Sequence, residues 1–132
     1  MWRDIQHIWN PNQDDIKSWA YSDSRIPEQD WELAVINFPN IPMICGLVDD
    51  PKCKHTRFFL GCLYVFVGDV VRSQNEQDIH QLTVILKRVT DSLKNENLTT
   101  WVQRSLQLIQ NPKLYNYEYW GLGSKYVYTS ES

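Results

Sequence analysis

The sequence contains little of what secreted or membrane proteins need. It has only three cysteines, Cys45, Cys53 and Cys62, an odd number whose spacing suits neither a disulfide framework nor paired zinc knuckles. Its first residues lack the apolar run of a secretory signal. The longest nearly uncharged stretch, residues 58–68, is shorter than the roughly 18 residues that cross a bilayer. We therefore expect a cytoplasmic protein with reduced thiols and no membrane partner.

Motifs for catalysis and phosphate binding are also missing. The three histidines are scattered, no G-x-S-x-G motif occurs, and GLGS at residues 121–124 lacks the third glycine of a phosphate loop. Cys53 and His55 are two ligand types for zinc, but a structural zinc site needs four. We expect a protein without enzymatic activity, metal or cofactor. Asp69 is expected near the core, where it would pair with Arg72 or cap a neighbouring backbone group. An enzyme using Asp69 and a histidine is a minor alternative.

Positive charge is scarce in the first part of the chain. Residues 1–50 contain nine Asp and Glu against three Lys and Arg, whereas residues 51–132 contain seven against ten. An acidic chain with dispersed basic residues does not favour binding to nucleic acid, because phosphates need a basic face. The acidic part suits a basic protein partner instead, although the preference of helix starts for acids is a simpler explanation of the same pattern.

The composition that remains is typical of one globular domain. The chain has 132 residues, 42% hydrophobic and 22% charged, with six Trp and seven Tyr. No linker composition interrupts it. Apolar residues recur at spacings of three and four over most of its length, which indicates helices. We predict a single all-α domain, residues 1–132, of five or six helices, with the last three stacked as antiparallel hairpins.

Two short helices are predicted near the start. Asn12 is a suitable N-cap for the first, in which Ile16, Trp19 and Ala20 share one face. Pro27 suits the first position of the second helix, which residues 38–39 would end.

Four more segments are predicted after these. The apolar run at residues 41–48 is ambiguous between helix and strand, and its helical neighbours favour helix. Residues 54–73 are too long for a strand and predict a buried central helix. Ser73 and Glu76 fit a capping box that starts the next helix. A last helix with Trp101 on its apolar face would end at Asn111-Pro112.

Aromatic residues crowd into the segment NPKLYNYEYWGLGSKYVY, residues 111–128. Tyr and Trp fill cores, but they also anchor protein interfaces. We expect residues 112–132 to dock partly on the core. The residues expected to close the core are Leu114, Tyr115 and Trp120. Those left free to face a partner are Tyr117, Tyr119 and Lys125.

Five acidic residues are candidates for partner binding. Glu28 and Glu32 would lie one turn apart on a helix, with Asp30 between them in the sequence. Asp14 and Asp15 belong to the first turn of the neighbouring helix. We expect the two groups to form one negative face.

The segments DWELAVI (residues 30–36), RFFLGCLYVFVGDVVRS (57–73) and NPKLYNYEYWG (111–121) resemble those of small helical immunity proteins. Such proteins are encoded beside bacterial polymorphic toxins or contact-dependent growth inhibition toxins. The resemblance covers most of the chain, and the family has no shared catalytic residues to carry over. It implies a cytoplasmic protein that binds and neutralises a cognate toxin domain, often a nuclease.

The expected function is therefore stoichiometric inhibition of a toxin: this chain would block the toxin's active site or substrate groove without any chemistry of its own. The acidic first part suits a basic nuclease. The alternative is a helical scaffold or adaptor, without enzymatic activity, that binds an endogenous protein partner.

Overall fold

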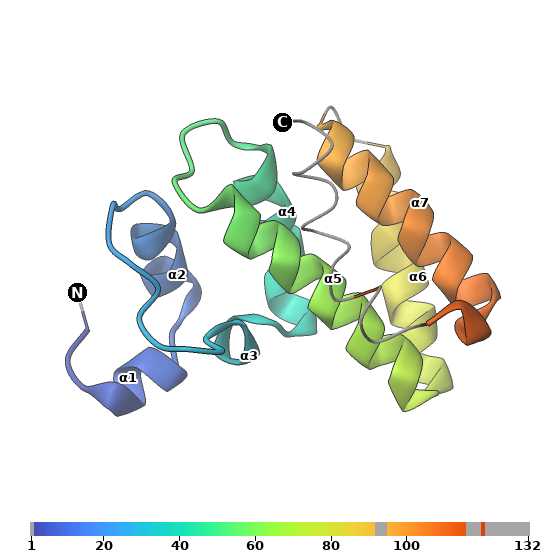
Figure 1. Ribbon diagram of the computed structural model, residues 1–132, viewed down its shortest axis with the longest axis horizontal. Helices are drawn as coiled ribbons and strands as arrows, with labels where there is room; N and C mark the ends of the chain where they lie inside the picture. The colour runs from blue at the N-terminus through green and yellow to red at the C-terminus, as the bar shows by residue number, and fades with distance from the viewer. Residues whose placement is uncertain (1, 92–94, 116–119, 121–132) are drawn as a thin grey trace.

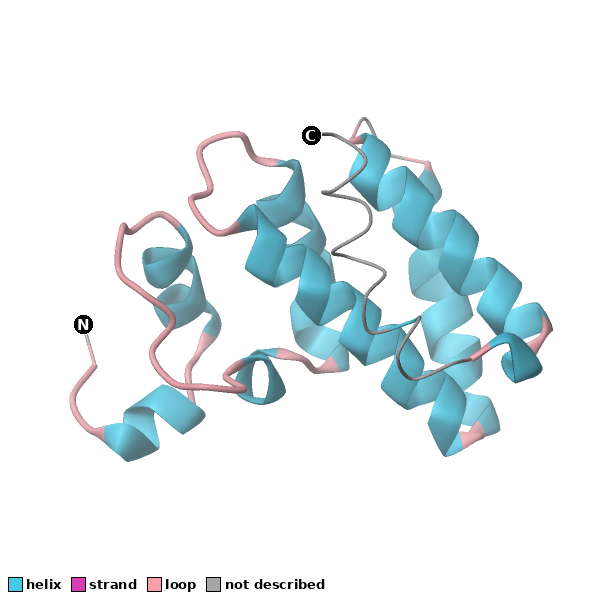
Figure 2. Cartoon of the chain, viewed as in Figure 1, coloured by secondary structure: helices cyan, strands magenta, loops and turns pink. Residues whose placement is uncertain are grey.

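The computed structural model describes residues 2–91, 95–115 and 120. These residues form seven α-helices and two short 3-10 helices, and they contain no strand (Figures 1 and 2), which confirms the all-α prediction. In chain order the elements are α1 (Ile5–Trp9), α2 (Gln13–Ala20), α3 (Glu32–Val35), η1 (Phe38–Asn40), α4 (Ile41–Asp49), α5 (Thr56–Ser73), α6 (Glu76–Thr90), α7 (Glu96–Gln110) and η2 (Pro112–Leu114).

The helix α5 lies at the centre of the molecule. It packs against α3, α4, α6 and α7, and Figure 1 shows it running between the N-terminal elements and the α6/α7 pair. Apolar side chains circle its axis, so most of the helix is buried, from Phe59 to Val71. The predicted central helix is confirmed, with its start at Thr56 rather than Lys54. None of the described helices is both long enough and apolar enough to span a bilayer.

The helices α5, α6 and α7 run in alternating directions, as predicted (Figure 1). The turn between α5 and α6 is made by Gln74, whose φ of 56° is left-handed and ends α5. Asn75 then caps α6 by accepting a hydrogen bond from the backbone N–H of Asp78 at 3.0 Å. The predicted capping box at Ser73 is wrong, because Ser73 is still inside α5 and its hydroxyl donates to the carbonyl of Val70.

The short N-terminal helices differ in how well they were predicted. Asn12 caps α2, and the predicted face of α2 is buried. The second predicted helix is wrong in its start, because α3 begins at Glu32 and not at Pro27. Asp30 has a left-handed φ of 62°, which a right-handed helix cannot contain. Residues 41–48 are helical, as favoured, within α4.

The C-terminal part closes the core through Trp120 but not through Leu114. Trp120 is 5% exposed, and its indole N–H donates to the carbonyl of Tyr64 at 2.7 Å. Tyr115 is half-buried and packs against the core. Leu114 is 57% exposed, so its predicted burial is wrong. It belongs to η2, which turns away from the end of α7 after Asn111.

Candidate interaction surface

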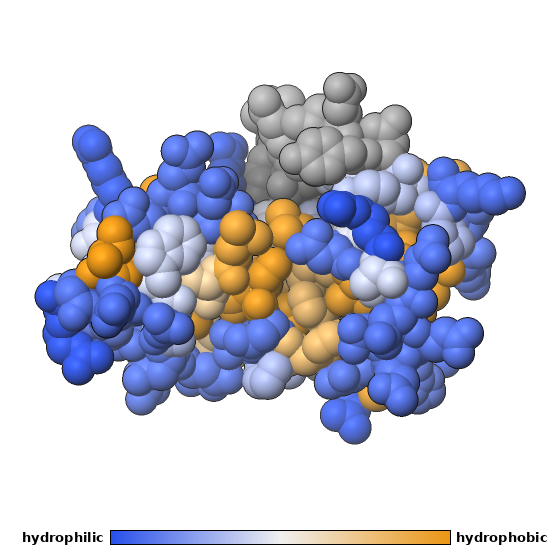
Figure 3. Space-filling model, turned by 90° about the horizontal axis from the view of Figure 1, so that it is seen from below, coloured by the Kyte–Doolittle hydropathy of each residue, from blue (hydrophilic) through white to orange (hydrophobic). Residues whose placement is uncertain are grey.

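The N-terminal lobe, defined here as residues 2–35 with α1, α2 and α3, contains most of the large apolar side chains that are exposed among the described residues. Five of the seven exposed large hydrophobic residues found among the described residues belong to it. Leu33 on α3 is 62% exposed and Ile5 on α1 is 59% exposed. Figure 3 shows one face of the molecule, on which hydrophobic residues gather in the middle of the view, and the left side, where the lobe begins, is mostly hydrophilic. Such a mixture of exposed apolar and polar side chains is typical of protein interfaces.

The helix α1 presents two of these apolar residues together. Ile5 and Trp9 lie one turn apart and therefore on the same side of the helix. Asp4 caps the helix by accepting a hydrogen bond from the backbone N–H of His7 at 2.8 Å. No helix was predicted here, because five residues are too few to show a helical period.

An aromatic cluster fixes the lobe to the rest of the molecule. Trp31 is fully buried, and its indole N–H donates to the carbonyl of Ile8 at 2.7 Å, which ties α1 to the segment before α3. Its ring meets Trp2 and Trp19 edge to face, with centroids 5.5 and 4.9 Å away. It also stacks on Phe58 of α5. These contacts hold the lobe in one arrangement, so little ordering would be required on binding.

Asp15, one of the predicted binding residues, acts inside the lobe. Its Oδ2 accepts a hydrogen bond from the backbone N–H of Asn12 at 2.9 Å and lies 3.0 Å from Nε2 of His7. Because Nδ1 of His7 accepts from the backbone N–H of Arg3, Nε2 carries the proton and donates to Asp15. The hydrogen bond from Asn12, followed by the contact with His7, lowers the pKa of the Asp15 carboxyl. Asp15 therefore caps α2 and joins it to α1.

The remaining predicted acids do not form one helical face. Glu28 precedes the start of α3 and Glu32 is its first residue, so the predicted one-turn spacing on a helix is wrong. Glu32 is half-buried beside α5, where its charge adds to burial in raising the pKa of the Cys62 thiol. Asp14 and Asp30 are exposed.

The four acids other than Asp15 form no ion pair with any described residue. The lobe as a whole has seven Asp and Glu against three Lys and Arg, a net formal charge of −4. The predicted partner residues Tyr117 and Tyr119 lie outside the described residues. The acidic character of the lobe thus comes from several separate carboxylates around its exposed apolar side chains.

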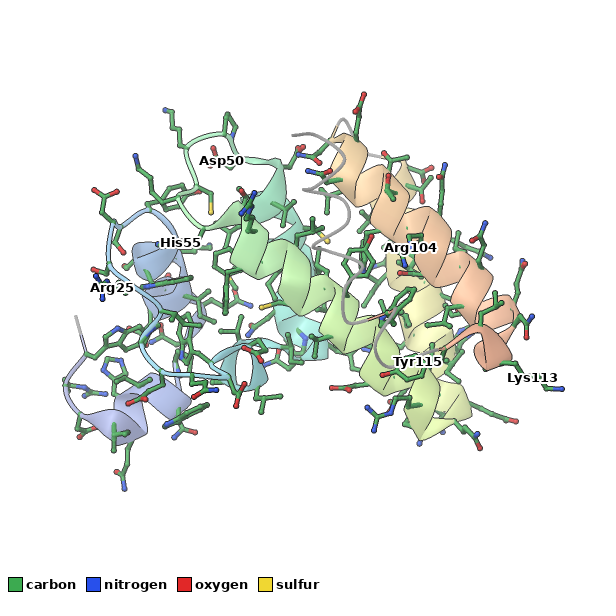
Figure 4. The ribbon with its side chains drawn as sticks, viewed as in Figure 1. Arg25, Asp50, His55, Arg104, Lys113 and Tyr115 are labelled. Carbon is green, nitrogen blue, oxygen red and sulfur yellow. The ribbon has the colours of Figure 1, made fainter. Side chains whose placement is uncertain are left out.

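A second set of contacts, not predicted from the sequence, closes the lobe onto the loop before α5 (Figure 4). The imidazole of His55 stacks on Trp19, with centroids 3.8 Å apart, and its Nε2 lies 2.9 Å from the carbonyl oxygen of Ser22. The hydroxyl of Tyr21 donates to Asp50 at 2.6 Å and thereby lowers the pKa of that carboxyl. These polar groups form hydrogen bonds with one another, so this edge of the lobe holds the fold together rather than offering free polar groups to a partner.

The residues considered for catalysis are not brought together. Asp69 pairs with Arg72 at 3.7 Å, as predicted, but both side chains are about half exposed, so the expected position near the core is wrong. A cavity of about 360 Å³ lies between α4, α6 and α7, and one of about 240 Å³ lies beside Arg104. Neither is lined by Asp69 or a histidine. In the described part of the chain, no three His, Cys, Asp or Glu side chains converge as metal ligands.

Comparisons of the chain with protein-family models, with curated proteins and with solved structures found no match.

Proposed function

We propose that this chain is an immunity protein, which binds a cognate basic toxin domain through the N-terminal lobe. The observation that carries the proposal is that exposed apolar side chains and unpaired carboxylates occur together in residues 2–35. In protein complexes, a few apolar anchors supply most of the affinity, and a polar rim surrounds them. The exposed side chains of Ile5, Trp9 and Leu33 are the proposed anchors.

The charge of the lobe favours a basic partner. Unpaired carboxylates attract a positively charged surface, which accelerates association and adds specificity. A nuclease presents such a surface, because its substrate groove must accommodate phosphates. Covering that groove would neutralise the toxin without any chemistry by the inhibitor. The resemblance of three segments to small helical immunity proteins agrees with this function.

The first experiment is co-expression of this chain with the polypeptide encoded by the neighbouring gene. We expect the polypeptide to be toxic alone, and we expect co-expression to restore growth and yield a 1:1 complex on purification. If the polypeptide is toxic and this chain neither restores growth nor binds it, the immunity function is wrong for this pair. A complex without any effect on toxicity would support an adaptor instead.

The binding face is tested by two matched leucine substitutions. Leu33→Arg places a charge in the proposed face, and Leu114→Arg places the same charge at an equally exposed leucine after α7. Because an anchor of an interface is typically worth more than about 1.4 kcal/mol, we expect Leu33→Arg to raise the Kd at least tenfold. Leu114→Arg should leave it unchanged. Calorimetric titration of the purified complex partners measures both, and equal effects of the two variants would exclude the lobe as the binding face.

A further inference from the structure

The larger cavity lies outside the N-terminal lobe and shares no residue with it. Its volume of about 360 Å³ is within the range of roughly 300 to 1,000 Å³ that is usual for small-molecule sites. Three helices line it, it is open to solvent on one side, and α4 supplies half of the lining. The lining residues are Pro42, Cys45, Gly46 and Asp49 from α4, Ile85, Arg88 and Val89 from α6, and Leu98 from α7.

The inner wall of the cavity is apolar. Leu98 and Cys45 are buried, and Ile85 packs against the same core. Burial raises the pKa of the Cys45 thiol to about 12. The thiol therefore stays neutral at physiological pH and behaves as a small apolar group. An apolar side chain of a ligand could pack on this wall and lose contact with water.

Gly46 widens the cavity. A glycine inside a helix destabilises it by about 1 kcal/mol relative to alanine. Close packing does not require this glycine, since a Cβ added at Gly46 would have no atom within 4 Å. Gly46 does line the cavity, where a long side chain such as leucine would occupy part of the volume.

Two opposite charges at the cavity have no partner among the described residues. Asp49 is the last residue of α4, and Arg88 is in the last turn of α6. Both side chains are exposed, and neither forms a hydrogen bond or ion pair with any other described residue. A carboxylate and a guanidinium that flank one cavity, but do not pair with each other, are complementary to a ligand that carries both charges.

We propose that this cavity binds a free α-amino acid with an apolar side chain. The ligand carboxylate pairs with the guanidinium of Arg88, and its ammonium group pairs with the carboxylate of Asp49. Its side chain packs on Cys45, Ile85 and Leu98. The three features of the site, one cationic, one anionic and one apolar, correspond to the three parts of such a ligand.

The test is titration of the isotope-labelled full chain with leucine or phenylalanine, followed by backbone amide chemical shifts. We expect saturable shifts on α4, α6 and α7 at millimolar ligand. The comparison probes are isoamylamine, which lacks the carboxylate, and 4-methylpentanoate, which lacks the ammonium group. Each should bind at least tenfold more weakly than leucine. No saturable shift with either amino acid up to about 10 mM, or equal binding of all probes, overturns the proposal.

Variants locate the site. Arg88→Gln should weaken leucine binding at least tenfold, whereas Lys87→Gln, an exposed neighbour on the same helix that does not line the cavity, should not. Gly46→Leu should abolish binding by filling the cavity. Gly46→Ala serves as a folded control, because its Cβ meets open space. Undiminished binding to both Arg88→Gln and Gly46→Leu would overturn the assignment. Neither result bears on toxin binding, which uses a different part of the molecule.

Discussion

Asp15 is a single side chain that holds two helices in place through its charge. Its hydrogen bond from Asn12 and its contact with His7 lower its pKa in the folded protein. A lowered folded-state pKa means that the charged form is favoured by folding. The resulting stability is present above the unfolded pKa of about 3.9, and it is lost as the pH falls through the folded-state value.

We expect Asp15→Asn to reduce the pH dependence of unfolding in the acid range. The variant has no carboxylate to ionise, so its free energy of unfolding at pH 7 should be lower than that of the parent protein. The difference should be at most about 1 kcal/mol, because solvent screens a partly exposed carboxylate. At pH 2 the variant and the parent should be nearly equal. Urea denaturation at both pH values measures this, with Asp14→Asn as the control, because Asp14 is exposed and unpaired. An unchanged difference between the two pH values in Asp15→Asn would show that another group is responsible.

At the scale of the helices, Gly46 in α4 and Gly68 in α5 have opposite surroundings. Gly46 on α4 faces open space. Gly68 on α5 is buried, and a Cβ there would lie 2.9 Å from Cδ1 of Trp120 and 3.2 Å from Cε2 of Tyr115. Gly68 therefore permits the close approach of Trp120, whereas Gly46 does not serve packing.

The same substitution should have opposite effects in the two helices. Gly46→Ala should raise the free energy of unfolding by about 0.5 to 1 kcal/mol, because alanine favours a helix. Gly68→Ala should lower it by about 1 to 3 kcal/mol, because the added methyl group overpacks a closed contact. Thermal denaturation of the two variants in parallel measures both effects. A stabilising Gly68→Ala would mean that Trp120 does not pack closely on α5.

The sequence predicted the longer helices well because their packing repeats along the element. In α6 and α7, apolar residues recur every three or four positions, and Asn111-Pro112 ends the second of them. Shorter elements depend on contacts with distant residues. The start of α3 follows a left-handed Asp30, and α1 is held by the indole of Trp31, which lies 23 positions beyond Ile8.

For the candidate interaction surface, the sequence predicted the negative charge but not the residues that form it. Counting Asp and Glu indicated an acidic first part, but it could not show that Asp15 is used internally or that Glu32 lies beside α5. The exposed anchors were also missed, because exposure of Ile5 or Leu33 depends on which elements leave them uncovered. Periodicity identifies buried faces far better than it identifies exposed ones.

At the scale of the whole molecule, charge is distributed unevenly, and this should govern how fast a basic partner binds. Asp14→Lys should slow association with the toxin several-fold and reduce its dependence on salt, because it removes attraction from the lobe. Glu76→Lys is the matched control, since both residues are exposed acids in the first turn of a helix. Stopped-flow association at low and high ionic strength measures both variants. Equal slowing by the two would indicate attraction to the net charge rather than to the lobe.

The aromatic cluster that fixes the N-terminal lobe also gives the lobe its own optical signature. The ring centroid of Trp31 lies 5.5 Å from that of Trp2 and 4.9 Å from that of Trp19, close enough for the electronic transitions of neighbouring rings to couple. His55 stacks on Trp19, so a rearrangement of the lobe would change the surroundings of this indole. Near-ultraviolet circular dichroism and intrinsic fluorescence should therefore report the state of the proposed binding face directly, so a partner could be followed as it docks without attaching a dye.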